Sequence, residues 1–405
     1  MSKPLVLTCD IGTQSARALL VDPDGRIVDV VQSKYAEPYF SKEPGWAEQK
    51  PNFYFDRLCE CCCELCARSN ALLPDVIAMT ITVIRDTVVC LDANNEPLRD
   101  IILWLDKRTV DPNGAMPAKN MMLFKVAGME PTAKVVYAAS VGNWIMRHEP
   151  EIWARTAKYV MLPTYLNYKL TGNLIDSASN QIGHIPFDYK NRRWMKPGSL
   201  TRCFCDVPNE KLCDLVPSGT VIGTVTDEVC ALTGIPAGLP LISTGSDKGC
   251  ETLGLAVVDS DKASISLGTT ATIQFSTTEY VEPQQFLPAY PGVLNDHYNP
   301  EIEIYRGLWL LSWFVKEFGT ADAIDAKEKG MAPEALLDER IRDLPAGSDG
   351  LLLQPYWTAS CTRTRSARSS AFPTTTRATT STAPSSRACA WSCTWRCASW
   401  RTARA

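Results

Sequence analysis

Residues 5–22 limit the fold of this chain more than any other segment. They read Leu-Val-Leu-Thr-Cys-Asp-Ile-Gly-Thr-Gln-Ser-Ala-Arg-Ala-Leu-Leu-Val-Asp, a short polar turn between two apolar runs of strand length. These runs favour a β-hairpin whose strands lie inside a sheet. In the turn, Gly12 leaves room for an anion to reach backbone N–H groups, and Asp10 is placed to hold a metal ion beside it. A tight hairpin with a capped turn and no ligand explains the stretch equally well.

A second stretch of the same kind lies about half a chain later. Residues 263–275 read Ala-Ser-Ile-Ser-Leu-Gly-Thr-Thr-Ala-Thr-Ile-Gln-Phe, which again predicts a strand, a Gly–Thr turn and a strand. Two such hairpins that face each other across a cleft can clamp a triphosphate with backbone N–H groups and hydroxyls. The repeat therefore favours anion binding over two plain hairpins.

Length and composition set the broad class of the protein. A chain of 405 residues predicts two domains. Its 45% hydrophobic and 21% charged residues are typical of soluble globular proteins. No basic segment followed by an apolar core opens the chain, and no apolar run reaches membrane-spanning length. We therefore expect a cytoplasmic protein without a membrane or nucleic-acid partner, and a homo-oligomer is compatible with these features.

Five of the 16 cysteines crowd one predicted helix, which Pro51 opens. Cys59, Cys62, Cys63 and Cys66 follow the i, i+3, i+4, i+7 spacing of one helix face, where cysteine acts as a small buried apolar residue. A metal cluster is the alternative, but neighbours one turn apart on a regular helix surround an ion poorly. Without a signal sequence, a disulfide framework is not expected.

Charged residues follow two predicted strands, 76–82 and 101–104. Charged groups at strand ends often face a cleft in α/β domains, where they can hydrogen-bond a polar substrate. Surface ion pairs are the alternative interpretation. The residues concerned are Arg85, Asp86, Asp106 and Arg108.

A further acid follows the predicted strand 240–244. Asp247 lies in the sequence Gly-Ser-Asp-Lys-Gly, just before a predicted helix at 250–256. It is therefore expected at or near a helix N-terminus, either as an N-cap or as a base that projects into a cleft. Earlier helices are predicted at 136–147 and 163–170, the second ended by Gly172.

Jointly these motifs resemble the FGGY carbohydrate kinases, which phosphorylate glycerol, other polyols and ketoses. The resemblance implies an α/β, two-domain actin-like ATPase (ribonuclease H-like) fold, with the second domain incomplete. It runs to about Tyr356 and implies an N-terminal domain at 1–246, the start of a C-terminal domain at 247–357, and a foreign tail at 358–405. The similar segments are Asp10–Arg17, Gly45-Trp-Ala-Glu-Gln49, Trp104-Leu-Asp-Lys-Arg108, 162–172, Gly245-Ser-Asp247 and Leu267-Gly-Thr-Thr270.

The resemblance also implies a role for individual residues. Asp247 would be the general base and also touch the substrate, and Asp10 would help to hold Mg²⁺. ATP would be bound by Gly12, Thr13, Gln14, Ser15, Arg17, Gly268, Thr269 and Gly307. A small polyol or ketose would be bound by Arg85, Asp86 and Tyr137.

Three departures from the family pattern matter. Thr164 stands where the family has aspartate, and Gly142 stands where lysine is usual ahead of Trp144. Arg85-Asp86 resembles the Arg-Glu pair of glycerol kinases more than the Gln-Met-His of xylulose kinases, so the sugar stays open. An actin-like or chaperone-like ATPase switch and a non-catalytic fragment are the alternative functions. Trp46, Glu48, Asp106 and Arg108, together with Asp247, favour the kinase.

The segment 358–405 differs in composition from everything before it. It consists almost entirely of Ser, Thr, Ala, Arg, Cys, Trp and Pro, and it carries eight arginines and no acidic residue. The remainder holds 33 basic and 45 acidic residues, a net charge of −12. A nucleic-acid-binding or membrane-binding tail, or a disordered linker, would explain the charge. Neither explains Trp391, Trp395 and Trp400 among the arginines, whereas a shifted reading frame of a GC-rich gene does.

We predict that the gene contains a one-base shift just after the Tyr356 codon. Residues 369–373, Ser-Ser-Ala-Phe-Pro, can be encoded TCA-TCG-GCT-TTT-CCG, and reading one base earlier after an A gives Ile-Ile-Gly-Phe-Ser. Residues 381–388 likewise conceal Tyr-Arg-Ala-Ile-Ile-Glu-Gly, which resembles the family in this region. Sequencing the gene tests this, and an intact frame that encodes the printed tail would refute it.

Overall fold

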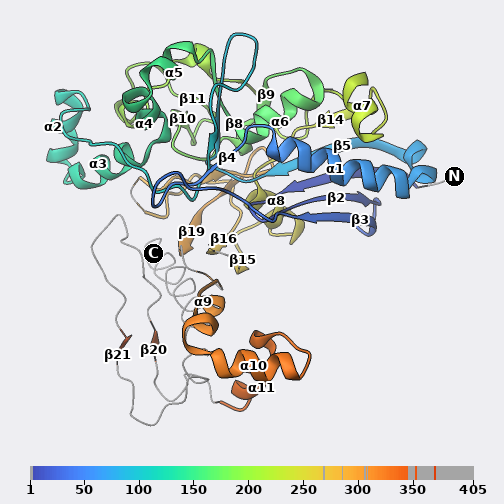
Figure 1. Cartoon of the computed structure of the whole chain (residues 1–405). Coiled ribbons are helices and arrows are strands. Elements are labelled where there is room, and N and C mark those ends of the chain that lie inside the picture. Colours follow the sequence, from blue (N-terminus) through green and yellow to red (C-terminus); the bar gives the residue numbers. More distant parts are fainter. Residues whose placement is uncertain are drawn as a thin grey trace. The chain divides into compact units, whose positions relative to one another are not determined.

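The computed structural model describes residues 3–267, 270–284, 286–304, 307 and 309–344, and the short strands at 352–353 and 369–370. The chain forms two compact units. Unit 1 comprises residues 1–256, 278–280 and 290–298, and unit 2 comprises residues 257–277, 281–289 and 299–405. Figure 1 shows the elements of each unit. None of the described helices has the length and apolar character that crossing a membrane requires.

Unit 1 is built on a six-stranded mixed sheet. Its order is β13-β14-β5-β1-β2-β3, and β1–β2 and β2–β3 pair antiparallel. The predicted hairpin is confirmed, because β1 and β2 both have strand neighbours on each side. The strands are β1 Leu5–Ile11, β2 Ser15–Val21, β3 Ile27–Lys34, β5 Val76–Val83, β13 Val221–Thr224 and β14 Pro240–Ile242.

Three neighbouring strands of this sheet, β14, β5 and β1, run parallel. Ile11 pairs with Val83 and Ile242 pairs with Thr80, so the three strands end at the same edge of the sheet. β1 and β5 alternate buried and half-buried residues, with Leu7, Cys9 and Met79 in the main core. The segments that follow these carboxyl ends therefore begin close together.

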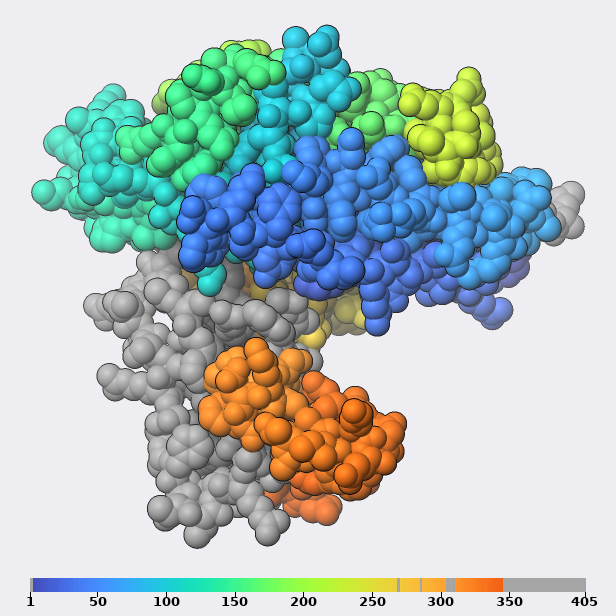
Figure 2. All heavy atoms as spheres, in the orientation of Figure 1, coloured from blue at the N-terminus to red at the C-terminus, as the bar shows by residue number. Residues whose placement is uncertain are grey.

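Helix α1 (Phe53–Arg68) packs on β2 and β3 and against α7 (Asp227–Thr233). Figure 2 shows α1 in blue and α7 in yellow-green side by side on one face of unit 1. The helix begins two residues after Pro51, which lies just outside it. Its buried stripe consists of Tyr54, Phe55, Leu58, Cys61, Cys62, Leu65 and Cys66.

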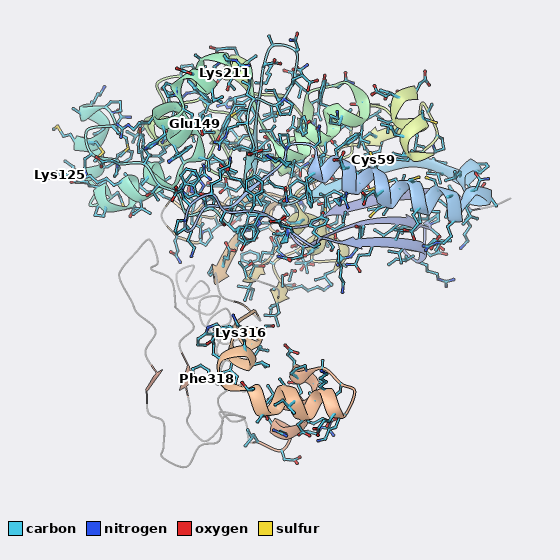
Figure 3. All side chains as sticks on the ribbon, in the orientation of Figure 1. Cys59, Lys125, Glu149, Lys211, Lys316 and Phe318 are labelled. Atoms are coloured by element: carbon cyan, nitrogen blue, oxygen red, sulfur yellow. The ribbon has the colours of Figure 1, made fainter. Side chains whose placement is uncertain are left out.

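The predicted cysteine face of α1 is confirmed for Cys62 and Cys66, which are buried, and wrong for Cys63. Cys63 is exposed and Cys59 half-buried, whereas Cys61 is buried with its thiol near the Ala16 carbonyl. The large side chains of Tyr54, Leu58 and Leu65 fix which side faces the sheet, and the cysteines follow. All cysteines in the described residues are free thiols, and no cluster suited to a metal occurs there. Burial raises the pKa of Cys59, labelled in Figure 3, to about 12, so its thiol is inert at neutral pH.

A second sheet of unit 1, of order β4-β7-β6-β8, has its own core around Phe187 and Tyr159. Its strands are β4 Glu48–Gln49, β7 Ile101–Ile102, β6 Val88–Leu91 and β8 Lys158–Met161. The single helix predicted at 136–147 was wrong. It is two helices separated at Ser140, whose hydroxyl accepts a hydrogen bond from the Asn143 N–H and caps the second helix. The predicted stop of the next helix at Gly172 is confirmed, with φ +80°.

The remaining elements of unit 1 are short and surround the two sheets. The helices are α2 Ala118–Val126, α3 Glu130–Ala139, α4 Val141–His148, α5 Pro150–Arg155, α6 Leu162–Thr171 and α8 Asp247–Gly254. Single 3₁₀ turns occur at Asn70–Asp75, Ala178–Asn180, Leu200–Phe204 and Asn209–Lys211. The short strands are β9 Ile175–Ser177, β10 Phe187–Asp188, β11 Arg193–Trp194, β12 Asp214–Val216, β17 Tyr290–Pro291 and β18 Tyr298–Asn299.

Unit 2 contains a three-stranded antiparallel sheet of order β15-β16-β19 and three helices. Leu267 pairs with Ala271, so the predicted second hairpin is confirmed in its strands, while Gly268 and Thr269 at its turn lie outside the described residues. The elements are β15 Ser264–Leu267, β16 Ala271–Gln274, β19 Glu301–Ile304, α9 Trp309–Phe318, α10 Thr320–Glu328, α11 Pro333–Ile341, β20 Leu352–Leu353 and β21 Ser369–Ser370.

Asp176 forms a buried polar cluster beneath α6. Its carboxylate accepts hydrogen bonds from the Thr164 hydroxyl (2.8 Å), the Ser177 N–H (2.7 Å) and the Asn180 side chain (2.8 Å). Thr164, which departs from the family pattern, thus contributes a hydroxyl donor to this cluster. Despite these donors, burial raises the pKa of Asp176 to about 6.

We predict that Asp176 makes the stability of unit 1 depend on pH. Because its folded pKa exceeds its unfolded value, the stabilisation is complete below the unfolded pKa and is lost as the pH rises through about 6. Between pH 4.5 and 7.5 the wild type should therefore lose about 2 kcal/mol relative to Asp176→Asn. Urea unfolding at several pH values measures this difference. Asp214→Asn, an exposed acid on neighbouring β12, is the control, and parallel curves for wild type and Asp176→Asn would contradict the prediction.

Candidate active site

The candidate active site of unit 1 lies where the parallel strands β1, β5 and β14 end. The N–H of Ile84, after β5, donates to the Ile11 carbonyl at the end of β1 (3.1 Å). The Thr82 hydroxyl donates to the carbonyl of Gly245, after β14 (3.1 Å). These bonds join the segments that carry Asp10, Arg85 and Asp247, three residues that the sequence predicted separately.

The turn after β1 has free backbone donors. The Gly12 N–H donates to the Ser15 carbonyl (3.0 Å), and the Gln14 carbonyl accepts from the Tyr35 N–H (2.9 Å). Among the described residues, the N–H groups of Thr13 and Gln14 make no backbone hydrogen bond. Two adjacent N–H groups at a turn are the donor arrangement that binds a phosphate oxygen.

The side chains around this turn are already paired with one another. Arg17 Nη1 lies 2.6 Å from Asp10 Oδ2, and both side chains are partly exposed. Gln32, oriented with its oxygen toward them, accepts from the Ser15 hydroxyl (3.2 Å) and from Arg17. The Thr13 hydroxyl accepts from the Trp104 indole N–H (3.0 Å). Arg17 is thus paired but 43% exposed, whereas the hydroxyl oxygens of Thr13 and Ser15 are engaged inside the protein.

Asp247 is the first residue of α8, and it is not the N-cap. Ser246 takes that role, because its hydroxyl accepts from the Gly249 N–H (3.3 Å). Asp247 Oδ1 instead lies 3.5 Å from Arg85 Nε, and the side chain is 28% exposed. Burial raises the pKa of Asp247, and the positive charge of Arg85 opposes that rise. A carboxylate held in this way can accept a proton from a bound hydroxyl.

Asp86 has a partner that sequence reasoning missed, His184. Oδ1 of Asp86 accepts from the His184 backbone N–H (3.0 Å), and Oδ2 lies 2.8 Å from His184 Nδ1. Burial raises the pKa of Asp86, but the charge and hydrogen bonds of His184 outweigh burial, so the net pKa is lowered. His184 lies in the polar and aromatic run 176–197, which contains no motif that singles it out.

The other predicted ligand residues are spread more widely. Tyr137 lies on α3, and its carbonyl accepts from Asn143 on α4 (3.0 Å), a contact that does not reach Arg85 or Asp247. Gly307 is buried in unit 2, where its carbonyl accepts from the Leu310 N–H at the start of α9 (3.0 Å). Figure 3 marks the end of α9 by Lys316 and Phe318. Gly268 and Thr269 lie outside the described residues.

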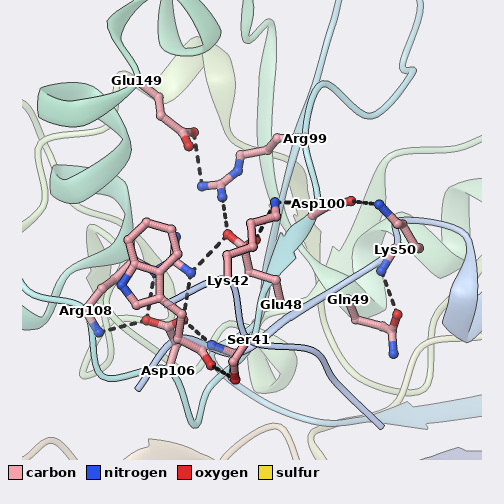
Figure 4. A network of polar contacts seen from close by, with 12 residues as sticks. Ser41, Lys42, Glu48, Gln49, Lys50, Arg99, Asp100, Asp106, Arg108 and Glu149 are labelled. Carbon is pink, nitrogen blue, oxygen red and sulfur yellow. Dashed lines mark hydrogen bonds and ion pairs between the residues drawn. The ribbon is translucent and has the colours of Figure 1, made fainter. Parts of the chain in front are cut away.

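The predicted substrate-side charges Asp106 and Arg108 form a buried structural network, shown in Figure 4. Their side chains are 1% exposed, as is that of Glu48. Arg108 donates to Asp106 through Nε and Nη2 (both 2.8 Å) and lies 3.0 Å from Glu48. The expectation of substrate-binding groups or surface ion pairs was therefore wrong for Asp106 and Arg108, because the folded chain covers both.

Aromatic rings and further cations complete this network. The Arg108 guanidinium lies 3.8 Å from the ring centre of Trp46 and 4.6 Å from that of Trp144. Glu48 also pairs with Arg99 (2.6 Å) and Lys42 (2.7 Å). Asp106 accepts a hydrogen bond from the Ala47 N–H (2.6 Å). This bond ties the loop that contains Trp46 and Ala47 to the segment after β7 that contains Asp106 and Arg108. The network fixes Trp46 and Glu48 as supports of the fold.

Gly142, the second departure from the family pattern, has a packing reason. A Cβ at this position would lie 3.2 Å from both Cys205 Sγ and the Tyr159 hydroxyl. Those neighbours are themselves buried in the second core of unit 1. A lysine side chain therefore has no room at this position in the present packing.

We predict that Arg108→Met destabilises unit 1 by about 3–5 kcal/mol, since it leaves Glu48 and Asp106 buried without their shared partner. Lys50→Met removes a 68% exposed cation from the rim of the same network and should cost less than about 1 kcal/mol. Denaturant unfolding of both variants measures the difference. Equal, small effects would show that the network is not essential for stability.

Three comparisons relate the chain to known proteins. A model of the N-terminal domain of the FGGY family of carbohydrate kinases matches residues 5–254. The sugar kinase YgcE of Escherichia coli is 25% identical over 88% of this chain and 65% of its own length. Xylulose kinase of Bacillus subtilis is 24% identical over 87% of this chain and 67% of its own. The chain thus spans about two thirds of the length of these relatives.

Solved structures share the fold. A xylulose kinase from Rhodospirillum rubrum superposes with a TM-score of 0.75 at 23% identity, covering 95% of this chain and 76% of that one. A glycerol kinase from Plasmodium falciparum with ADP gives 0.69 at 18% identity, covering 96% and 76%. These likenesses confirm the predicted α/β fold of the actin-like ATPases.

Proposed function

The chain belongs to the FGGY family of carbohydrate kinases, and on that premise we propose that it transfers the terminal phosphoryl group of ATP to a hydroxyl of a small polyol or ketose. The observation that carries this proposal is the pair of Asp247 and Arg85 beside the first turn. Sugar kinases among the relatives support the reaction class, and the identity of the sugar is left open.

Asp247 is the proposed general base. The substrate hydroxyl attacks the terminal phosphorus, its proton passes to Asp247, and the bond between that phosphorus and the ADP oxygen breaks. A carboxylate suits this role when it is ionised yet partly shielded from water. Burial raises the pKa of Asp247 and so increases its proton affinity, while Arg85, 3.5 Å away, keeps the charged form accessible. Arg85 would also donate to the sugar.

The turn at 12–14 is the proposed first phosphate loop. The unused N–H groups of Thr13 and Gln14 would bind phosphate oxygens, and Arg17 would supply positive charge. Gly12 keeps this turn narrow, since a Cβ there would lie 3.2 Å from the Ser15 carbonyl oxygen. Ser15 would contribute as a support of the loop. Gly268, Thr269 and Gly307 are proposed as further nucleotide-binding residues.

Mg²⁺ is proposed to bind with the nucleotide. Asp10 is a single carboxylate at this turn, and the described residues contain no cluster of three ligands suited to a metal. Mg²⁺ is commonly held by one or two carboxylates together with substrate phosphates and water, so one carboxylate fits an ion that arrives with ATP. The ion would neutralise phosphate charge. Asp10 would then release Arg17 and bind the ion instead.

We retain the proposed division into domains 1–246 and 247–357 and a tail of foreign sequence at 358–405. Relatives align over 86–88% of this chain, close to the share that precedes residue 358. A shifted frame would produce a tail that relatives do not share. The frame-corrected protein is accordingly the better subject for activity measurements.

We predict sugar-dependent ADP release that requires Asp247. A coupled assay of the frame-corrected protein with glycerol, erythritol, xylulose and ribulose measures it, and ADP release independent of every sugar would favour an ATPase switch. Asp247→Asn should lower kcat by at least about 100-fold. Because Asp247 must be ionised, kcat/KM of the wild type should fall as the pH drops through its raised pKa.

Asp227→Asn is the matched control for that variant. Asp227 is likewise the first residue of a helix, follows a threonine N-cap and is exposed on α7. It should leave kcat unchanged. Equal activity of the two variants would refute the role of Asp247 as base.

A further inference from the structure

His184 and Asp86 form a contact that the proposed reaction does not use. The backbone N–H and the Nδ1 of His184 meet the two oxygens of the Asp86 carboxylate, at 3.0 and 2.8 Å. Nδ1 must carry a proton to donate to a carboxylate, so the contact fixes how the ring is turned. The His184 side chain is 36% exposed, and in the described part of the chain its Nε2 makes no hydrogen bond.

The backbone around this pair is held in an unusual conformation. Asp86 has φ +46°, a left-handed value that is rare outside glycine. Opposite it, a Cβ on Gly183 would lie 2.3 Å from Asp86 Oδ1. The Tyr189 hydroxyl accepts a hydrogen bond from the Gly183 N–H and donates one to the Gly183 carbonyl. The Asp86 N–H donates to the Ile182 carbonyl (3.0 Å). Strain that is fixed from several sides in this way is typical of ligand sites.

The pair adjoins the proposed site directly. Arg85, the neighbour of Asp86 in sequence, has its guanidinium group 3.5 Å from Asp247 and 5.5 Å from the ring centre of Tyr290. Tyr189 packs edge-on against Tyr290, 5.6 Å between ring centres. His184 is thus connected to Arg85 through its contact with Asp86, and Arg85 in turn lies beside Asp247 and the Tyr290 ring.

We infer that His184 is a substrate-binding residue whose Nε2–H donates to an oxygen of the sugar, and that Asp86 is its positioning residue. This inference rests on the proposed kinase function. It adds His184 to the substrate-binding groups, since each oxygen of the Asp86 carboxylate already accepts one hydrogen bond from His184 and so fixes the position of its ring. Protonated imidazole and guanidinium are donors only. His184 and Arg85 together therefore favour a substrate with a carbonyl or carboxylate oxygen over the matching polyol.

The charge of Asp86 favours the protonated form of His184. Burial lowers the pKa of His184, but the charge and hydrogen bond of Asp86 outweigh burial, and the net pKa is raised. The other titratable groups near Asp86 are Arg85, Tyr159, Tyr189 and Cys205. Burial raises the pKa of Tyr159, Tyr189 and Cys205, so these three groups stay neutral. Asp86 and Arg85 are the charged members of the set.

Two substitutions separate the contacts of the two ring nitrogens. In His184→Asn the amide nitrogen takes the place of Nδ1, so the contact with Asp86 remains and the donor to the sugar is lost. In His184→Gln the amide nitrogen reaches the place of Nε2. Calorimetric titration of the full 405-residue chain with xylulose, xylonate and xylitol, without ATP, gives each Kd independently of turnover.

We expect the ketose or the acid to bind more tightly than xylitol. His184→Asn should weaken that binding by about 10-fold or more, with an unchanged melting temperature, and His184→Gln should weaken it less. His297→Asn is the matched control, because His297 also pairs through Nδ1 with an aspartate, Asp296 (2.6 Å). Equal affinity of His184→Asn and wild type, or preference for xylitol, would overturn the inference. A chain that binds none of the three would refute the sugar-binding function itself, and this role with it.

Histidine NMR provides a second readout that a purely structural role would not change. The chain has three histidines, so single variants assign their signals. The pKa of His184 should rise when the sugar binds, because the complex needs the proton on Nε2, and Asp86→Asn should lower it. Sugar binding should weaken as the pH passes above that pKa, and at a lower pH in Asp86→Asn. A pKa unchanged by a sugar that does bind would overturn the inference.

Discussion

The site depends on one constraint, the parallel pairing of β14, β5 and β1. Parallel neighbours end at the same edge of a sheet, so the segments after them must start side by side. The first turn, Arg85 and the start of α8 come from positions up to about 240 residues apart in sequence, yet the bonds from Ile84 to Ile11 and from Thr82 to Gly245 join them. A change of register in β5 would separate all three at once.

The buried ion network around Arg108 performs a different task. Isolated buried charges are costly, and here every charged group has at least one partner of opposite sign, with the Arg108 guanidinium also close to the rings of Trp46 and Trp144. The network joins the loop before Glu48, the strand β7 and helix α4. Trp104, two residues before Asp106, in turn donates to Thr13 in the first turn. Through Trp104 the segment that carries Asp106 and Arg108 is therefore fixed to the first turn.

Sequence patterns predicted the elements better than they predicted the partners. The hairpin at 5–22, the strands at its repeat and the position of Asp247 at the start of a helix followed from alternation, turn residues and capping, which are local. The burial of Arg108, the break at Ser140 and the pairing of Asp86 with His184 depend on residues distant in sequence. The cysteine face of α1 was partly misplaced because the pattern of the cysteines was used in place of the larger Tyr54, Leu58 and Leu65.

Three aspartates of unit 1 show how the surroundings of a side chain give the same residue type different roles. Burial raises the pKa of Asp176, which is enclosed by hydroxyl and amide donors and serves the fold. Burial also raises the pKa of Asp247, which faces a single guanidinium at 3.5 Å and stays partly exposed. His184 lowers the pKa of Asp86. Neighbouring acids whose proton affinities are driven apart are the usual sign of divided roles. Asp247 is thus the acid suited to accept a proton, and Asp86 the one suited to remain charged and hold His184.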